Sequence, residues 1–110
     1  MRTCRVGEVV IVPFPFTDRD SSKRRPALVC SSDAFNRQTR HVVLAMITTA
    51  THSAWSGDVP IKDLDAAGLP AASVVRWKLF TLDASLVIRR AGALSSKDRK
   101  ACRVRQPVAI

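Results

Sequence analysis

The chain has no tyrosine, and its aromatic residues are four phenylalanines and two tryptophans among 110 residues. Aliphatic side chains must therefore form most of the core, and a base-stacking surface built from many aromatic rings is excluded. Hydrophobic residues still make up 46% of the chain, which excludes a disordered protein. The length suits a single domain over residues 1–110.

Cysteine and long hydrophobic runs are also scarce. The three cysteines are far apart and form no Cys-x-x-Cys pair, so we expect no metal site and no cofactor. Asp18 and Asp20 lack a histidine partner and make a poor metal pair. No apolar run approaches the roughly 20 residues of a membrane helix, and the N-terminus lacks a signal-peptide core. Unpaired thiols favour a reducing compartment, so the prediction is a soluble cytoplasmic protein with no membrane partner.

Acidic residues are few, because nine Asp and Glu stand against eighteen Lys and Arg, for a formal net charge of +9. Such a charge favours polyanions, with nucleic acid first and an anionic membrane second. A merely solubilising surface is the alternative explanation. Arginine outnumbers lysine, which suits bidentate contacts to phosphate.

Short apolar runs between turn signals indicate strands rather than long helices. Strands are expected at residues 9–12, 27–30, 41–49, 58–61, 73–79 and 86–90. Residues 34–40 are expected to form a turn or short loop, residues 64–69 a short helical turn or a loop, and residues 81–83 a turn. A helix should begin after Ser95, which has Asp98 three residues on as in a capping box, and end before Pro107. The pattern predicts a mainly β fold, a small bent sheet or barrel with a short C-terminal helix.

One segment stands out near the N-terminus. Residues 7–16 hold a β-branched run closed by two prolines, and after a polar loop the chain continues with three cations directly before Pro26. Proline biases the residue before it toward extended backbone. Arg25 is therefore presented at the entrance of a strand, as a phosphate-binding arginine would need to be.

Several short motifs, taken in order, resemble the MazF/PemK-like toxins of type II toxin–antitoxin systems. They are Gly-Glu-Val-Val at residues 7–10, Arg-Pro-Ala-Leu-Val at 25–29, Ala-Met-Ile-Thr-Thr at 45–49, Gly-Leu at 68–69, Ser-Val-Val-Arg at 73–76 and Phe-Thr-Leu-Asp at 80–83. Each is weak alone, but together they cover residues 7 to about 94. The Pro-Phe-Pro-Phe run is compatible with a PemK-like branch.

The resemblance implies a fold and an activity. The fold would be an SH3-like barrel related to the CcdB gyrase poisons, usually as a homodimer. The activity would be metal-independent, sequence-specific endoribonuclease cleavage of single-stranded RNA, often mRNA, which inhibits translation and growth. The partner would be an acidic cognate antitoxin, a protein with a DNA-binding domain whose disordered tail occupies the RNA groove.

The resemblance also assigns roles to residues. Arg25 matches the catalytic arginine, whose guanidinium would stabilise charge on the phosphate oxygens. Thr48 matches the catalytic threonine, and Thr49 is the adjacent alternative, since only one of the two should face the groove. Predicted RNA contacts are Lys23, Arg24, Thr49, Trp55, Arg76 and Lys78.

Other candidates carry less weight. Trp77 should face away from Arg76 and Lys78 and serve as a core or dimer residue. His52 is a lone histidine to which the resemblance gives no catalytic role, and Asp83 is expected to cap a turn. The final helix looks shorter and more cationic than is usual in the family.

Two further readings of the chain stay open. One is a CcdB-like toxin that poisons a protein target such as gyrase, and the pairing of Arg25 with Thr48 argues against it. The other is a basic nucleic-acid-binding module without chemistry, which would show salt-sensitive binding and no cleavage.

Overall fold

The computed structural model describes residues 4–14, 23–50 and 54–108. These form one six-stranded sheet with the strand order β4-β5-β3-β2-β1-β6, in which every neighbouring pair is antiparallel. The strands are β1 (Glu8–Phe14), β2 (Lys23–Val29), β3 (His41–Thr49), β4 (Val59–Pro60), β5 (Ser73–Asp83) and β6 (Arg89–Ala93). The helices are α1 (Asp33–Thr39), α2 (Leu64–Ala67) and α3 (Ser96–Arg105), with a 3-10 turn at Ala84–Leu86. The prediction of a mainly β fold with one C-terminal helix is confirmed.

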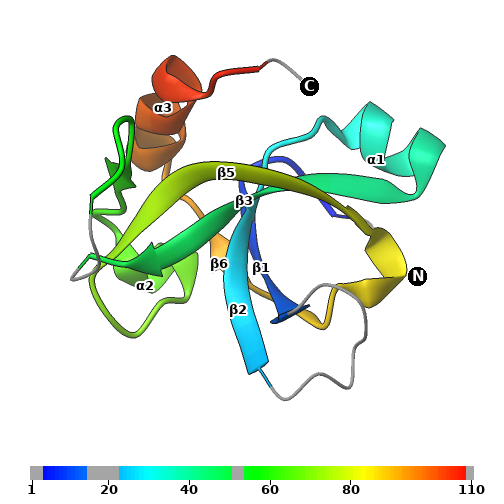
Figure 1. Cartoon of the computed structure of the whole chain (residues 1–110), viewed down its shortest axis with the longest axis horizontal. Helices are drawn as coiled ribbons and strands as arrows, with labels where there is room; N and C mark the ends of the chain where they lie inside the picture. Colours follow the sequence, from blue (N-terminus) through cyan, green and yellow to red (C-terminus); the bar gives the residue numbers. More distant parts are fainter. Residues whose placement is uncertain (1–3, 15–22, 51–53, 109–110) are drawn as a thin grey trace.

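The sheet is strongly curved and buries residues on both faces. In Figure 1, α2 and α3 lie on one side of it and α1 lies on the other. Alternate residues of β1 serve different cores, because successive strand residues point to opposite faces. Val9 packs in a first cluster with Leu28 and Ile47, and Val10 packs in a second with Val29. The aliphatic residues on the two faces of the sheet therefore form two separate small cores.

The segment after β2 differs from the expected loop at residues 34–40, because it is the helix α1. Ser32 caps the helix by accepting a hydrogen bond from the Phe35 N–H, and Arg40 ends it in a left-handed conformation. Asn36 is buried in the helix, and its amide donates to the Cys4 and Ser31 carbonyls. These long-range bonds stabilise a short helix of modest intrinsic propensity.

The later strands also deviate from the prediction. The expected turn at residues 81–83 is strand, since β5 continues to Asp83 and the turn is the 3-10 segment that follows. Asp83 caps that turn by accepting from the N–H and hydroxyl of Ser85, as predicted, and these bonds lower the pKa of its carboxyl. The last strand lies at Arg89–Ala93 rather than at residues 86–90.

The C-terminal helix begins where the sequence predicted, with the Ser95 hydroxyl accepting from the Asp98 N–H at 3.2 Å. The Asp98 carboxylate does not return to the cap. It is 2% exposed and accepts from the backbone N–H groups of Lys62 and Asp63 at 3.0–3.2 Å. A predicted capping-box acid therefore ties α3 to the segment that enters α2.

No helix within the described ranges is both long and apolar enough to cross a membrane.

Candidate functional site

A pocket of about 360 Å³ lies at the edge of the sheet where β2 begins and β3 ends. Arg25 and Pro26 line it from β2, and Met46, Ile47, Thr48 and Thr49 line it from β3. The segment between α2 and β5 closes it with Leu69, Pro70 and Ala71, and Ser73 closes it from the start of β5. The pocket therefore brings together the two residues predicted to be catalytic.

The pairing of β2 with β3 explains this meeting. Ala27 pairs with Met46 at the end of the β2–β3 ladder, and Arg25 and Thr48 each lie two residues beyond that pair. Alternation along β3 gives Thr48 the sheet face of Arg25 and gives Thr49 the other face, although both threonines line the pocket. Arg25 is exposed and Thr48 is half-buried, so a flexible cation stands beside a more rigid hydroxyl.

Pro26 contributes to the placement of Arg25. It lies within β2 opposite Ile11 of β1, and Arg25 lies opposite Val12. Extended backbone at Arg25 is thus enforced both by the following proline and by the sheet. Lys23 and Arg24 precede it at the start of the strand, and both are exposed.

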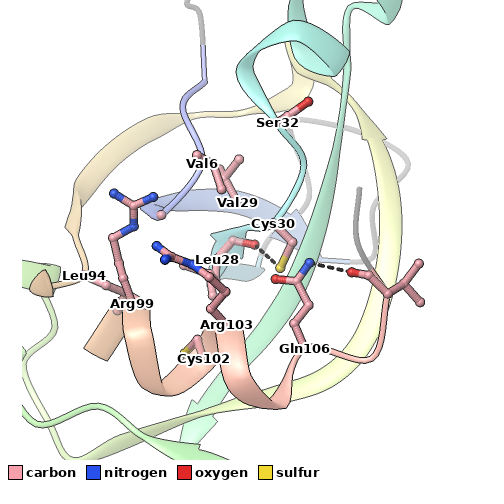
Figure 2. Close-up of a pocket in the computed structure, with 12 residues that line it drawn as sticks. Val6, Leu28, Val29, Cys30, Ser32, Leu94, Arg99, Cys102, Arg103 and Gln106 are labelled. Carbon is pink, nitrogen blue, oxygen red and sulfur yellow. Dashed lines mark hydrogen bonds between the residues drawn. The ribbon is translucent and has the colours of Figure 1, made fainter. Parts of the chain in front are cut away.

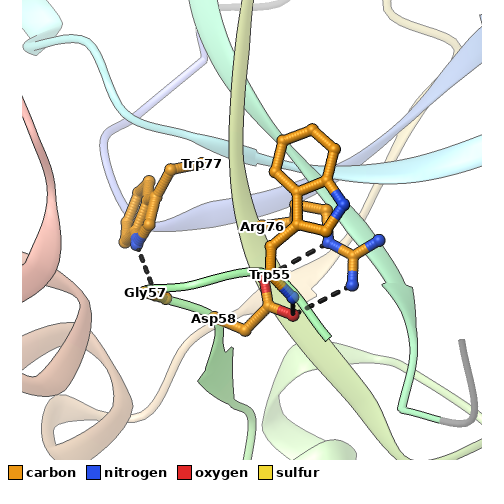
Figure 3. A network of polar contacts seen from close by, with 5 residues as sticks. All are labelled: Trp55, Gly57, Asp58, Arg76 and Trp77. Carbon is orange, nitrogen blue, oxygen red and sulfur yellow. Dashed lines mark hydrogen bonds and ion pairs between the residues drawn. The ribbon is translucent and has the colours of Figure 1, made fainter. Parts of the chain in front are cut away.

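A second polar cluster lies along β5 and contains two predicted RNA contacts (Figure 3). The Arg76 guanidinium donates twice to the Asp58 carboxylate, at 3.2 and 2.9 Å. Its central carbon lies 5.1 Å from the centre of the Trp55 ring, within the range of a cation–π contact. The Asp58 carboxylate also accepts a hydrogen bond from the backbone N–H of Trp55 at 3.0 Å. One carboxylate therefore holds both the arginine and the tryptophan.

The ion pair has the expected effect on both groups. Hydrogen bonds from Arg76 lower the pKa of the Asp58 carboxyl, and Asp58 in turn raises the pKa of Arg76. Sequence analysis missed Asp58 because the two residues are 18 positions apart. The available signal was a carboxylate at the start of the strand expected at residues 58–61, which pairs with the strand of Arg76 in the structure.

Trp77 lies on the other side of β5 from Arg76, as predicted (Figure 3). Its indole donates to the Gly57 carbonyl at 2.8 Å, and its ring packs against the first core cluster. The register shifts here, because Ala45 pairs with Leu79 while Met46 pairs with Arg76. Trp77 and Lys78 therefore form a two-residue bulge in β5. Because the bulge contains two residues, the side chains before and after it still alternate between the two faces of the sheet. Lys78 is exposed.

Some candidates fall outside the described residues. These are Asp18, Asp20 and His52. Within the described ranges, no group of three His, Cys, Asp or Glu residues could hold a metal ion. Arg90 of β6 pairs with Glu8 of β1 at 2.7 Å.

Residues 5–105 match the sequence profile of the PemK-like, MazF-like toxin of type II toxin–antitoxin systems. This chain belongs to that family. No curated protein sequence matches it. The toxin-family assignment agrees with the resemblance carried by the short motifs.

Solved structures of toxins show the same fold at low sequence identity. A mycobacterial endoribonuclease solved with its cognate antitoxin is 19% identical, covers 94% of this chain and 89% of its own, and superposes with a TM-score of 0.72. A chain of a MazE–MazF structure from Deinococcus radiodurans is 18% identical, covers 96% of this chain and 92% of its own, and superposes with a TM-score of 0.73. The Mycobacterium tuberculosis toxin MazF-mt6 is 23% identical, covers 88% of this chain and 89% of its own, and superposes with a TM-score of 0.70.

Proposed function

We propose that residues 1–110 form one toxin domain that cleaves single-stranded RNA without a metal ion and thereby inhibits translation and growth. The observation that carries the proposal is that Arg25 and Thr48 line one pocket in a chain of this toxin family. Structural relatives described as endoribonucleases support the same activity.

The proposed reaction begins with attack of a ribose 2′-hydroxyl on the adjacent phosphorus. The bond to the 5′-oxygen then breaks, which leaves a cyclic phosphate and a 5′-hydroxyl end. Negative charge grows on the non-bridging oxygens, where the Arg25 guanidinium would stabilise it. The proton of the attacking 2′-hydroxyl would pass to a water molecule, because arginine is protonated at neutral pH and is a poor base. The leaving 5′-oxygen would take up a proton from the Arg25 guanidinium or from water. The Thr48 hydroxyl would orient the phosphate or the attacking hydroxyl.

RNA would extend from this pocket across cationic and aromatic residues. Lys23 and Arg24 would contact flanking phosphates, and Thr49 would line the groove beside the reacting group. Trp55 is 47% exposed and would stack on an unpaired base. Arg76 would act mainly by supporting the Trp55 ring, because Asp58 already binds its guanidinium. Lys78 would add to the positive field.

The proposed partners follow from the charge and from the relatives. An acidic cognate antitoxin would neutralise the +9 chain, and a mycobacterial relative has been solved with its antitoxin. We propose a homodimer acting in the cytoplasm, where RNA and antitoxin meet.

Cleavage of a long unstructured RNA by the purified protein in excess EDTA, with the new ends mapped, tests the proposal. Thr48→Val should lower the rate by about 100-fold or more, and Arg25→Ala by a similar factor. Thr81→Val is the matched control, because it removes an exposed strand hydroxyl that does not line the pocket, and it should change the rate by less than about fivefold. Folded Arg25→Ala and Thr48→Val proteins that cut at the wild-type rate would refute these roles. Wild-type protein that binds RNA without cutting it would point instead to a binding module or to a protein-poisoning toxin.

A further inference from the structure

Asp58 lies at the centre of the polar cluster on β5 and fixes the turn that carries Trp55 (Figure 3). Its carboxylate accepts from the Trp55 backbone N–H at 3.0 Å, and its own N–H donates to the Trp55 carbonyl at 3.2 Å. The same carboxylate binds the Arg76 guanidinium through two hydrogen bonds. One side chain therefore closes the turn at residues 55–58 and also attaches it to β5.

The ring of Trp55 is held from one side and open on the rest. The Arg76 guanidinium lies over the ring, with its central carbon 5.1 Å from the ring centre. The Arg76 and Asp58 side chains are only 12% and 13% exposed, whereas Trp55 is 47% exposed. These three residues form what we call the stacking platform. A flat, unpaired base fits the exposed part of the ring, because stacking on an aromatic side chain requires a π face and no particular base edge.

The strand register places the stacking platform on the face of the sheet that carries Arg25 and Thr48. Arg76 pairs with Met46, and directly opposite residues of an antiparallel pair share a face. Thr48 is two residues beyond Met46 on β3, so it shares that face as well. Diagonal neighbours of this kind lie about 7–8 Å apart. Arg76 is therefore a near neighbour of the reacting groups, across one strand.

The cations of α3 lie on the other face of the sheet. Arg99 and Arg103 line a separate pocket of about 300 Å³ between α3 and β2 (Figure 2). Cys102 of the same helix packs in the first core cluster with Ile47, whose neighbour Thr48 points to the opposite face. An RNA strand that crosses the face of Thr48 therefore meets the stacking platform rather than these arginines.

We propose that Asp58 is a positioning residue for RNA cleavage, which fixes the Trp55 ring so that one unpaired base close to the cleaved bond stacks on it. The inference rests on the proposed function. The Asp58 oxygens act through the protein, because they accept three hydrogen bonds from Trp55 and Arg76. Stacking is gained equally in the bound substrate and in the transition state, so its loss should raise KM and leave kcat unchanged.

The sign of the effect separates positioning from general electrostatics. Asp58→Asn removes one negative charge from a chain of net charge +9, so electrostatics alone would tighten RNA binding. The Asn amide nitrogen cannot accept a hydrogen bond, so the two-point contact with Arg76 is lost and the Trp55 ring is less well held. Our proposal therefore predicts weaker RNA binding when this anion is removed.

The test combines variant proteins with variant RNA. A short single-stranded RNA with one mapped cut site is made in versions that carry a single abasic residue at each position around the cut. For wild-type protein, one abasic position should raise KM at least about fivefold, with kcat within about twofold. Asp58→Asn should raise KM for intact RNA by a similar factor, and it should no longer respond to that abasic position.

Glu8→Gln is the matched control for the loss of a carboxylate. Glu8 likewise accepts from a backbone N–H, that of Arg5 at 2.8 Å, and pairs with an arginine side chain, that of Arg90 at 2.7 Å. It lies on β1 where this strand pairs with β6, away from the stacking platform. Glu8→Gln should leave KM within about twofold and keep the full abasic penalty.

Two companion variants test the same idea without changing Asp58, and circular dichroism checks that every variant is folded. Trp55→Ala removes the ring and should show the same raised KM and the same indifference to the abasic position as Asp58→Asn. Arg76→Lys keeps the charge but loses the planar, two-point contact. It should weaken the abasic penalty at least about twofold.

Three results would overturn the proposal. Tighter RNA binding by Asp58→Asn would show that Asp58 merely screens Arg76 from phosphate. An abasic penalty that persists in Trp55→Ala would place the base elsewhere. A full abasic penalty in folded Asp58→Asn would refute the positioning role while wild-type cleavage leaves the proposed function intact. If wild-type protein does not cut RNA, the proposed function fails, and the same abasic scan is read as dissociation constants by fluorescence anisotropy, which still tests the stacking platform.

Discussion

The most informative perturbation of the fold is Asp98→Ala. Asp98 is almost fully buried, and its carboxylate accepts hydrogen bonds from two backbone N–H groups, those of Lys62 and Asp63. These N–H groups lie in the turn before α2, so no helix or strand bond replaces the lost acceptor. The variant would leave both donors unsatisfied beneath α3.

The size of the effect follows from these contacts. A hydrogen bond to a charged acceptor contributes about 1.5–3 kcal/mol, and the two bonds here are part-buried, so Asp98→Ala should lower the free energy of unfolding by about 3 kcal/mol. A domain of this length loses roughly 4 °C of melting temperature per kcal/mol, which predicts a drop of about 12 °C. Asp98→Asn keeps one acceptor oxygen and should lose about half as much.

Urea unfolding followed by tryptophan fluorescence and circular dichroism measures the change. Asp65→Ala is the matched control, because it removes an exposed carboxylate from the first turn of α2. It should cost less than about 1 kcal/mol. If Asp98→Ala is destabilised no more than Asp65→Ala, then the carboxylate does not tie α3 to α2 as argued.

Three further predictions concern the core, the polar cluster and a close contact. Burial raises the pKa of Cys30 to about 12 and that of Cys102 to about 11. Neither thiol should therefore react with iodoacetamide at pH 8 until urea unfolds the protein, and stoichiometric labelling of folded protein would contradict this. The pKa of Asp58 is lowered from its usual 3.8, so its stabilising contribution is present above that pH and is lost as the pH falls through the folded-state value. The stability difference between wild type and Asp58→Asn should accordingly shrink in acid, and a difference that grows would refute the ion pair. Gly92→Ala should cost about 1–3 kcal/mol in urea unfolding, since its Cβ would lie 2.3 Å from the Ala66 carbonyl oxygen; unchanged stability would show that β6 and α2 separate freely.

Most of the sheet was predictable because its strands are short β-branched runs with turn residues between them. The residues expected to form a third strand, His41–Thr49, are the observed ones. The helix at Asp33–Thr39 was not predictable in the same way, because its apolar content is low and it is held by tertiary bonds. Chief among them are those of Asn36, whose amide donates to Cys4 and whose carbonyl accepts from the Ser31 hydroxyl.

The candidate site likewise contains residues that could be predicted from the sequence and residues that could not. Arg25 and Thr48 could be named from local motifs, and strand pairing then accounts for their meeting in one pocket. The role of Arg76 could not be read locally. Its guanidinium contacts Asp58 and Trp55, which lie in the segment between β3 and β4. Sequence reasoning finds residues with the right chemistry, but it cannot tell which of them another part of the chain already binds.

The use made of the few carboxylates explains how the positive charge stays available. Glu8 and Asp58 pair with arginines. Other carboxylates accept hydrogen bonds from backbone N–H groups and so fix turns and helix ends: Asp33, Asp63, Asp83 and Asp98. An acid that caps a helix or a turn stabilises the fold without neutralising a cation at a binding surface. These four carboxylates thus stabilise the fold, and none of them lines the pocket of Arg25 and Thr48.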